Sequence, residues 1–157
     1  MKQIEDKQKA IKYLRDDVYC TLDVSTIAKI GLFALKTIPK DIDPIKPYEE
    51  YGWLILHDSD AESIHPNVRH KFSEKMFSPR NTKIFILDFC DYLSQYINHS
   101  TANPNVKPAE TPSGIITTRV VDEGEELLLD FREMRKYLEK NFNWKCDLPP
   151  GINGVKK

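Results

Sequence analysis

Within Ser94-Gln95-Tyr96-Ile97-Asn98-His99-Ser100-Thr101-Ala102-Asn103-Pro104-Asn105 the sequence changes from an amphipathic pattern to a polar one. An amphipathic segment leads into a polar Asn-His-Ser step, and an Asn-Pro-Asn sequence follows shortly after it. This change is typical of an abrupt end of regular structure, where side chains and freed backbone groups can face a ligand. On its own the stretch predicts only a turn. Its meaning depends on two further segments, 25–34 and 124–131.

The size and composition of the chain are typical of a single domain. Its 157 residues are 40% hydrophobic and 30% charged, which is sufficient for a hydrophobic core. A net charge of -1 produces no overall field, so we expect neither nucleic acid nor a membrane as a direct partner. The cysteines form no Cys-x-x-Cys pair, and no apolar run approaches the roughly 20 residues of a membrane span. We therefore expect a soluble intracellular protein, in the cytoplasm or the nucleus.

The pattern of apolar residues predicts a mainly β protein with short helices. An amphipathic helix is expected over 4–16, at most one helix between 58 and 79, at about 67–76, and a charged helix over 132–142. The proline-rich segment 103–113 is expected to be a loop. Strands are expected over 18–24, 31–35, 52–56, 83–89, 114–121 and 127–131. Strands and helices do not alternate regularly, which argues against a Rossmann-type fold.

The predicted elements divide the chain into three parts. An N-terminal helix occupies 1–17, the main domain 18–132, and a C-terminal helix with a tail 133–157. Three histidines, His57, His65 and His70, lie in one stretch of the main domain. They form no pair at i, i+4 with an acidic third ligand, so we expect no metal site.

Three short sequences follow one another at domain-like spacing. The first is Ser25-Thr26-Ile27-Ala28-Lys29-Ile30-Gly31-Leu32-Phe33-Ala34, and the second is Tyr96-Ile97-Asn98-His99-Ser100 with Pro104-Asn105. The third runs from Thr118-Arg119 through Glu123-Gly124-Glu125-Glu126-Leu127 to Asp130-Phe131. Together they resemble the motifs of the SET-domain protein-lysine methyltransferases, over about 19–131. The zinc-binding cysteine clusters that flank this domain in many relatives are absent from the sequence.

This resemblance implies a β-clip fold, in which several small sheets surround a knot-like crossing. It also implies S-adenosylmethionine as the methyl donor. By the family pattern, the backbone of Lys29, Ile30 and Gly31, the side chain of Asn98 and the backbone of His99 would contact this cofactor.

The resemblance further implies a protein or peptide substrate that carries a lysine, such as a histone. Tyr96 and Leu129 would line the channel for that lysine, and Phe131 stands at the catalytic position. Near the C-terminus, Phe142 and Trp144 are candidates for an aromatic lid over the adenine, and Trp144 is assigned to the cofactor site on this basis. A plain core role for this end of the helix is the favoured alternative. The oligomeric state is left open between monomer and homodimer.

Three positions depart from the family pattern. Phe131 replaces a tyrosine, and its ring lacks the hydroxyl that lies close to the reacting amine. Lys29 replaces a glycine, which would permit a positive φ and close approach of the backbone. Leu129 replaces an aromatic residue that helps to set the number of methyl groups added.

These departures leave several functions open. The leading prediction is a protein-lysine methyltransferase. Either another tyrosine, such as Tyr48, Tyr51 or Tyr96, supplies the missing oxygen, or the protein is a weak enzyme or none. The second is a non-catalytic SET-like module that binds a peptide or the cofactor. The third is an unrelated small β-rich scaffold, for which the crossing near Asn98 and Phe131 would be absent.

Overall fold

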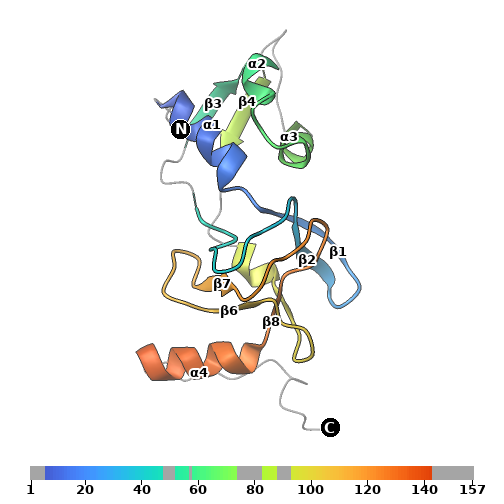
Figure 1. Ribbon diagram of the computed structural model, residues 1–157, viewed down its shortest axis with the longest axis vertical. Coiled ribbons are helices and arrows are strands. Elements are labelled where there is room, and N and C mark those ends of the chain that lie inside the picture. Colours follow the sequence, from blue (N-terminus) through green and yellow to red (C-terminus); the bar gives the residue numbers. More distant parts are fainter. Residues whose placement is uncertain (1–5, 48–51, 57, 74–82, 88–92, 143–157) are drawn as a thin grey trace.

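The computed structural model describes residues 6–47, 52–56, 58–73, 83–87 and 93–142. Figure 1 shows two regions along the long axis. Helices α1, α2 and α3 and the β3–β4 pair lie at one end, and the remaining strands with α4 form the other. The three sequence motifs all belong to this second, strand-rich region.

Helix α1 (Lys7–Asp16) is the predicted amphipathic helix, and its part within the described residues is confirmed. Asp6 caps it, because its side chain accepts a hydrogen bond from the Lys9 amide at 2.9 Å. One face of the helix is buried. The members of this face are Ala10, Ile11, Tyr13 and Leu14. The Tyr13 hydroxyl also donates to the carbonyl of Lys46, which lies outside the helix, at 2.7 Å. This bond ties α1 to the strand-rich region.

Strands β1 (Cys20–Ser25) and β2 (Lys29–Ala34) form an antiparallel hairpin, within two residues of the predicted positions. Ser25 pairs with Lys29, so only residues 26–28 connect the two strands. Lys29 has a φ of 65°, in the left-handed region that favours glycine. The glycine that the family pattern has at this position therefore corresponds to a real backbone requirement.

Strands β3 (Gly52–Leu56) and β4 (Lys83–Leu87) form a second antiparallel pair, as the predicted strands 52–56 and 83–89 indicated. The prediction of at most one helix between 58 and 79 was wrong, because α2 (Asp58–Ala61) and α3 (Pro66–Ser73) both lie there. Helix α3 begins with proline, whose fixed φ and missing N–H suit the first helical position. His65 precedes it, and its Nδ1 accepts from the Asn67 amide at 3.3 Å.

A four-stranded sheet contains the strands around the second and third motifs. Its order is β5 (Asn98–His99), β8 (Leu128–Leu129), β6 (Val106–Pro108) and β7 (Ile115–Thr117). Strand β8 comes last in the chain but lies between β5 and β6, parallel to both. The last strand thus enters between two strands that residues 100–105 connect, which is the crossing that the sequence predicted.

Three segments of this sheet differ from the prediction. Segment 103–113 was expected to be a loop, yet Val106–Pro108 forms β6, which ends at its proline because proline cannot donate further ladder hydrogen bonds. The predicted strands 114–121 and 127–131 shorten to Ile115–Thr117 and Leu128–Leu129. The second of these ends early because Asp130 caps helix α4 (Phe131–Phe142) and accepts from the Arg132 amide at 2.9 Å.

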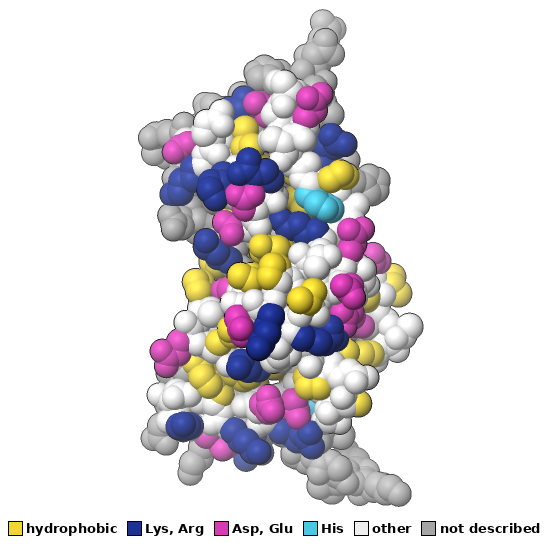
Figure 2. All heavy atoms as spheres, in the orientation of Figure 1, with side chains coloured by type: hydrophobic (Ala, Val, Ile, Leu, Met, Phe, Trp, Pro, Cys, Tyr) yellow, Lys and Arg dark blue, Asp and Glu magenta, His cyan; other side chains and the backbone are white. Residues whose placement is uncertain are grey.

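The hydrophobic core lies beneath the hairpin and the four-stranded sheet. Its fully buried members include Leu32, Ile38, Val106, Ile115, Val121 and Leu127. The predicted fold class is confirmed: the chain has small sheets and a few short helices, and most of it is strand and loop, consistent with a small β-rich SET-like fold. Within the described residues no helix has the length and apolar character needed to span a membrane. Charges of both signs are interspersed over the face shown in Figure 2.

Candidate functional site

Hydrogen bonds of the backbone bring the three motif segments together. The Leu127 amide donates to the Leu32 carbonyl at 2.7 Å, which joins the third motif to β2. The Ser100 amide donates to the Leu129 carbonyl at 3.1 Å, and this bond joins the second motif to β8. The third motif therefore lies between the other two.

The side chain of Asn98 lies where the three segments meet. Its Nδ2 atom is 3.1 Å from Ser25 Oγ, 3.0 Å from the Ile30 carbonyl and 2.6 Å from Glu126 Oε1. All three neighbours accept hydrogen bonds, so the amide nitrogen must face them and Oδ1 must face the other way. Asn98 is only 9% exposed, and within the described part of the chain Oδ1 has no hydrogen-bond partner. We name this group the Asn98 junction: Ser25, Ile30, Gly31, Asn98 and Glu126.

The carboxylate of Glu126 occupies the centre of the Asn98 junction. It accepts from Asn98 Nδ2 through Oε1 and from the Ser25 hydroxyl through Oε2 at 3.1 Å. Gly31 lies directly beside it, and a Cβ at residue 31 would overlap the carboxylate. The glycine that the motif places at 31 thus leaves room for Glu126.

His99 and Phe131 contact each other on the other side of the crossing. The Phe131 amide donates to His99 Nδ1 at 3.1 Å, and the ring centroids are 5.2 Å apart at an interplanar angle of 43°. Nδ1 must carry a lone pair to accept this bond, so the neutral ring has its proton on Nε2. The Leu129 carbonyl, 3.2 Å from Nδ1, accepts instead from the Ser100 amide.

The structure brings some of the predicted site residues into contact and leaves others apart. Asn98 bonds directly to Ile30, and His99 contacts Leu129 and Phe131. Lys29 is exposed at the end of the hairpin, and Tyr96 is half-buried at the end of the short helix η1 (Leu93–Tyr96). Trp144 and two of the tyrosines suggested as oxygen donors, Tyr48 and Tyr51, lie outside the described residues.

Sequence reasoning assigned no role to three residues that hold the site together. Ser25 and Glu126 bond to Asn98, and Asn105 bonds to the third motif through its side chain. The Asn105 side chain donates to the Glu126 carbonyl at 2.8 Å and accepts from the Leu128 amide at 2.7 Å. All three residues lie within the quoted motifs, so their membership of a motif was the signal that could have identified them.

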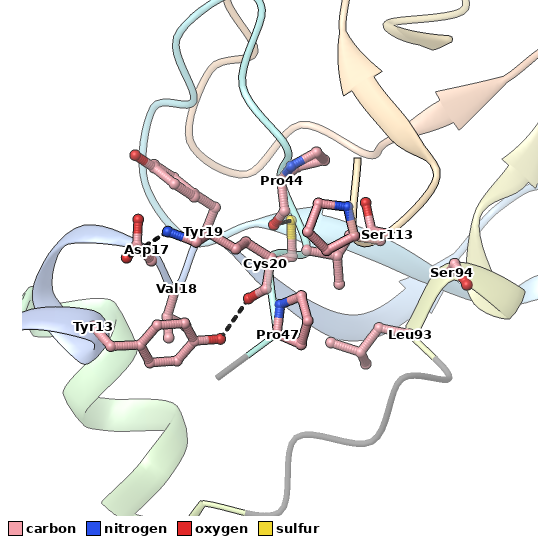
Figure 3. Close-up of a pocket in the computed structure, with 13 residues that line it drawn as sticks. Tyr13, Asp17, Val18, Tyr19, Cys20, Pro44, Pro47, Leu93, Ser94 and Ser113 are labelled. Atoms are coloured by element: carbon pink, nitrogen blue, oxygen red, sulfur yellow. Dashed lines mark hydrogen bonds and ion pairs between the residues drawn. The ribbon is translucent and has the colours of Figure 1, made fainter. Parts of the chain in front are cut away.

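A cavity of about 110 Å³ lies between the end of α1, the start of β1 and residues 44–47 (Figure 3). Its lining includes Tyr13, Asp17, Tyr19, Pro47 and Leu93, and it includes none of the predicted site residues. This cavity therefore gives no support to a ligand at the Asn98 junction. That assignment depends on the contacts between the junction residues themselves. Within the described residues, no group of three or more His, Cys, Asp or Glu side chains could hold a metal ion.

Comparisons with known proteins do not assign a function to this site. No protein-family model matches the chain, and no curated protein matches it. Among the solved structures that match is a crystal structure from Plasmodium falciparum, described as a candidate histone methyltransferase. The two chains are 16% identical with a TM-score of 0.33, over 73% of this chain and 93% of the other. At this level of similarity we transfer no function from that protein.

Proposed function

We propose that this protein is a SET-type protein-lysine N-methyltransferase that uses S-adenosylmethionine and has low activity. The side chain of Asn98 carries the proposal, because it bonds to residues of both other motif segments. Its partners Ser25 and Glu126 are 73 and 28 residues away in the chain. Three sequences that resemble one family thus contribute to a single buried polar group, which supports a shared role at a ligand site.

The residues of the Asn98 junction fit the amino-acid end of this cofactor. Asn98 is a buried residue whose Oδ1 has no hydrogen-bond partner among the described residues, and a donor from a ligand would satisfy this acceptor. Under the proposal, Asn98 and the backbone of Lys29, Ile30, Gly31 and His99 hold the cofactor. When bound, S-adenosylmethionine supplies a methyl group on an electrophilic sulfonium.

The chain itself would orient the substrate amine and exclude water from it. A lysine amine attacks only when it is neutral, and an apolar channel lowers its pKa because it disfavours the charged form. Leu129, which is buried, and Tyr96, which is half-buried, are the residues we assign to that channel. Correct positioning of two reacting groups then contributes most of the acceleration.

A second candidate function is a SET-like module that binds the cofactor or a peptide without methyl transfer. Phe131 favours it, because its ring lies against His99 and carries no hydroxyl. An oriented catalytic hydroxyl is typically worth on the order of 10²–10⁴ in rate. The loss of this group therefore lowers the expected activity substantially, and the remaining contacts would still bind a ligand.

The decisive experiment combines a transfer assay with a binding titration. The protein is incubated with labelled S-adenosylmethionine and a panel of histone and cellular protein substrates, and the donor is titrated in parallel by calorimetry. Binding with transfer supports the methyltransferase, and binding without transfer supports the module. Absence of both contradicts the methyltransferase and a module that binds the cofactor. Asn98→Ala should lose binding, whereas Asn103→Ala, at an exposed position of the same stretch, is the matched control.

A further inference from the structure

Three large aliphatic side chains are exposed at the tip of the β1–β2 hairpin. Val24 is 80% exposed, Ile27 50% and Ile30 48%. Val24 and Ile30 lie opposite each other in the hairpin, and Ile27 lies in the turn that connects the two strands. Figure 1 shows this tip projecting at the side of the strand-rich region. Exposed aliphatic side chains that are neighbours in this way are typical of an interaction surface. We name these three residues the hairpin patch.

The hairpin patch extends an apolar face that the core covers elsewhere. Leu32 and Ala34 lie on the same face of β2 as Ile30, because side chains alternate along a strand, and both are buried. The Val24 amide donates to Asp23 Oδ1 at 2.7 Å, so this amide is not available to a further strand at the edge of β1. A partner would therefore contact the side chains of the patch rather than pair with the backbone at Val24.

The hairpin tip also carries an unpaired cation. Lys29 is exposed next to Ile30, and its ammonium has no hydrogen bond and no ion pair among the described residues. A cation beside aliphatic side chains favours a partner that has a carboxylate next to bulky aliphatic residues. It disfavours a second copy of this chain, because a two-fold interface on the hairpin patch would bring two Lys29 ammonium groups together.

We infer that the hairpin patch and Lys29 form a docking surface for an extended segment of a partner protein, in which aliphatic side chains stand next to an acidic residue. Ile30 connects this surface to the Asn98 junction, because its carbonyl accepts from Asn98 Nδ2 at 3.0 Å. The assignment of the segment to the lysine-bearing substrate rests on the proposed function. Under that function, the surface selects lysines in aliphatic and acidic sequences over lysines in basic tails.

Three fluorescein-labelled peptides of equal length, each with a central lysine, test the two components of the surface. The first contains isoleucines and a glutamate. The second has an arginine in place of the glutamate, and the third has serines in place of the isoleucines. Binding is measured by fluorescence anisotropy without a methyl donor. Wild type should bind the first peptide at least about threefold more tightly than either of the others, and its preference over the second should shrink at high salt.

The apolar component is tested by a pair of matched valine variants. Val24→Ser should weaken binding of the first peptide by at least about threefold. Val120→Ser should leave it unchanged and is the control, because Val120 is also exposed, at 51%. Its neighbour Val121 pairs with Ile38, beyond the end of β2 that is far from the hairpin tip.

The charge is tested by a pair of lysine variants. Lys29→Glu keeps a Cβ at the positive φ of this residue and should reverse the preference between the glutamate and arginine peptides. Lys107→Glu, at an exposed position of β6, should keep the wild-type preference. The preference of wild type itself requires no variant, so a variant that fails to fold does not remove the test.

The results that overturn the docking surface differ from those that overturn the proposed function. Equal affinity of wild type for the three peptides, equal losses in Val24→Ser and Val120→Ser, or no peptide binding would overturn the docking surface alone. A wild-type dimer in sedimentation velocity that Val24→Ser dissociates would also overturn it, because a second copy would then cover the patch. The expected peptide preference without binding of S-adenosylmethionine would overturn the proposed function and leave the docking surface in place.

Discussion

Gly31 lies against the carboxylate of Glu126 so closely that no side chain fits between them. A Cβ at residue 31 would lie 2.8 Å from Glu126 Cδ and 3.0 Å from Ser25 Cβ. Glutamate side chains are flexible, but this one is held by Asn98 and Ser25. The position of the Glu126 carboxylate therefore depends on the absence of a side chain at Gly31, although the two residues are 95 positions apart in the printed sequence.

We expect Gly31→Ala to destabilise the protein by about 1–3 kcal/mol, because the added methyl group displaces the Glu126 carboxylate. The free energy of unfolding is measured by chemical denaturation. The same substitution is made in a Glu126→Ala background, where the space is vacant and the cost should fall by more than about 1 kcal/mol. Additive effects of the two substitutions would contradict this pairing.

Lys29→Gly should stabilise the protein by about 1 kcal/mol. The φ of 65° at Lys29 is costly for any residue with a Cβ, and glycine removes that cost while it adds some entropy to the unfolded chain. Lys29→Ala keeps the Cβ and should give no gain in thermal denaturation. An equal gain from alanine would mean that the lysine charge, rather than the backbone, is responsible.

The Lys29→Gly variant also tests the role of the Lys29 ammonium at the proposed cofactor site. If this group pairs with the carboxylate of the cofactor, calorimetric titration should show weaker binding by Lys29→Gly. Tighter binding by the glycine variant would show instead that the lysine obstructs the site or repels the sulfonium.

Asn105→Ala should cost about 1–3 kcal/mol, because Asn105 is fully buried and its loss leaves the part-buried Glu126 carbonyl and Leu128 amide without this partner. Asn103→Ala is the matched control, since Asn103 is exposed two residues earlier and should change stability little. The midpoints of urea unfolding of the two variants provide the comparison. A cost for Asn105→Ala no larger than that of Asn103→Ala would mean that this side chain does not hold the crossing.

Phe131→Tyr should raise the rate of methyl transfer by about tenfold or more, because it restores an oriented hydroxyl at the catalytic position. The rate is measured with labelled donor on a substrate that wild type and variant both bind. Phe131→Leu, which adds no oxygen, should give no gain. If the tyrosine variant is no faster than wild type, another group already supplies the hydroxyl or the site is not catalytic.

The carboxylate of Asp130 should make stability depend on pH. Its side-chain hydrogen bonds with Arg132 lower the pKa of Asp130 in the folded protein, against the opposing effect of burial. A lowered pKa means that the stabilisation is present above the unfolded pKa of about 3.9 and is lost as the pH falls through the folded pKa. Asp130→Asn keeps the cap of α4 but removes the charge.

Unfolding of wild type and Asp130→Asn is therefore compared from about pH 7 down to about pH 3. The difference should stay below about 1 kcal/mol at neutral pH, because the Arg132 side chain is 50% exposed, and it should shrink below about pH 4. A difference that is constant over this range would assign the effect to the cap alone.

Local signals in the sequence predicted the parts of the fold that depend on neighbours in the chain. The apolar face of α1 and the two strands that form the β1–β2 hairpin each arise within about ten residues. The positive φ at Lys29 was indicated by the glycine of the family pattern. The short strand β6 and the one-turn helix α2 were missed because three or four residues carry too little periodicity. The role of Glu126 was missed for another reason: its bond with Ser25 spans 101 residues, and the two residues meet where backbone hydrogen bonds join 125–127 to β2.

The position of β8 between β5 and β6 has a consequence for the order in which the chain folds. During synthesis, Asn98 emerges from the ribosome before Glu126 and Leu129. The hydrogen bond from its side-chain amide to the Glu126 carboxylate can therefore form only later. At about 5–20 residues per second this delay is on the order of seconds. Contacts between such distant residues also form slowly, because loop closure comes first. The Asn98 junction is therefore one of the last parts of the protein to form, and a nascent chain carries the motif sequences well before they come together.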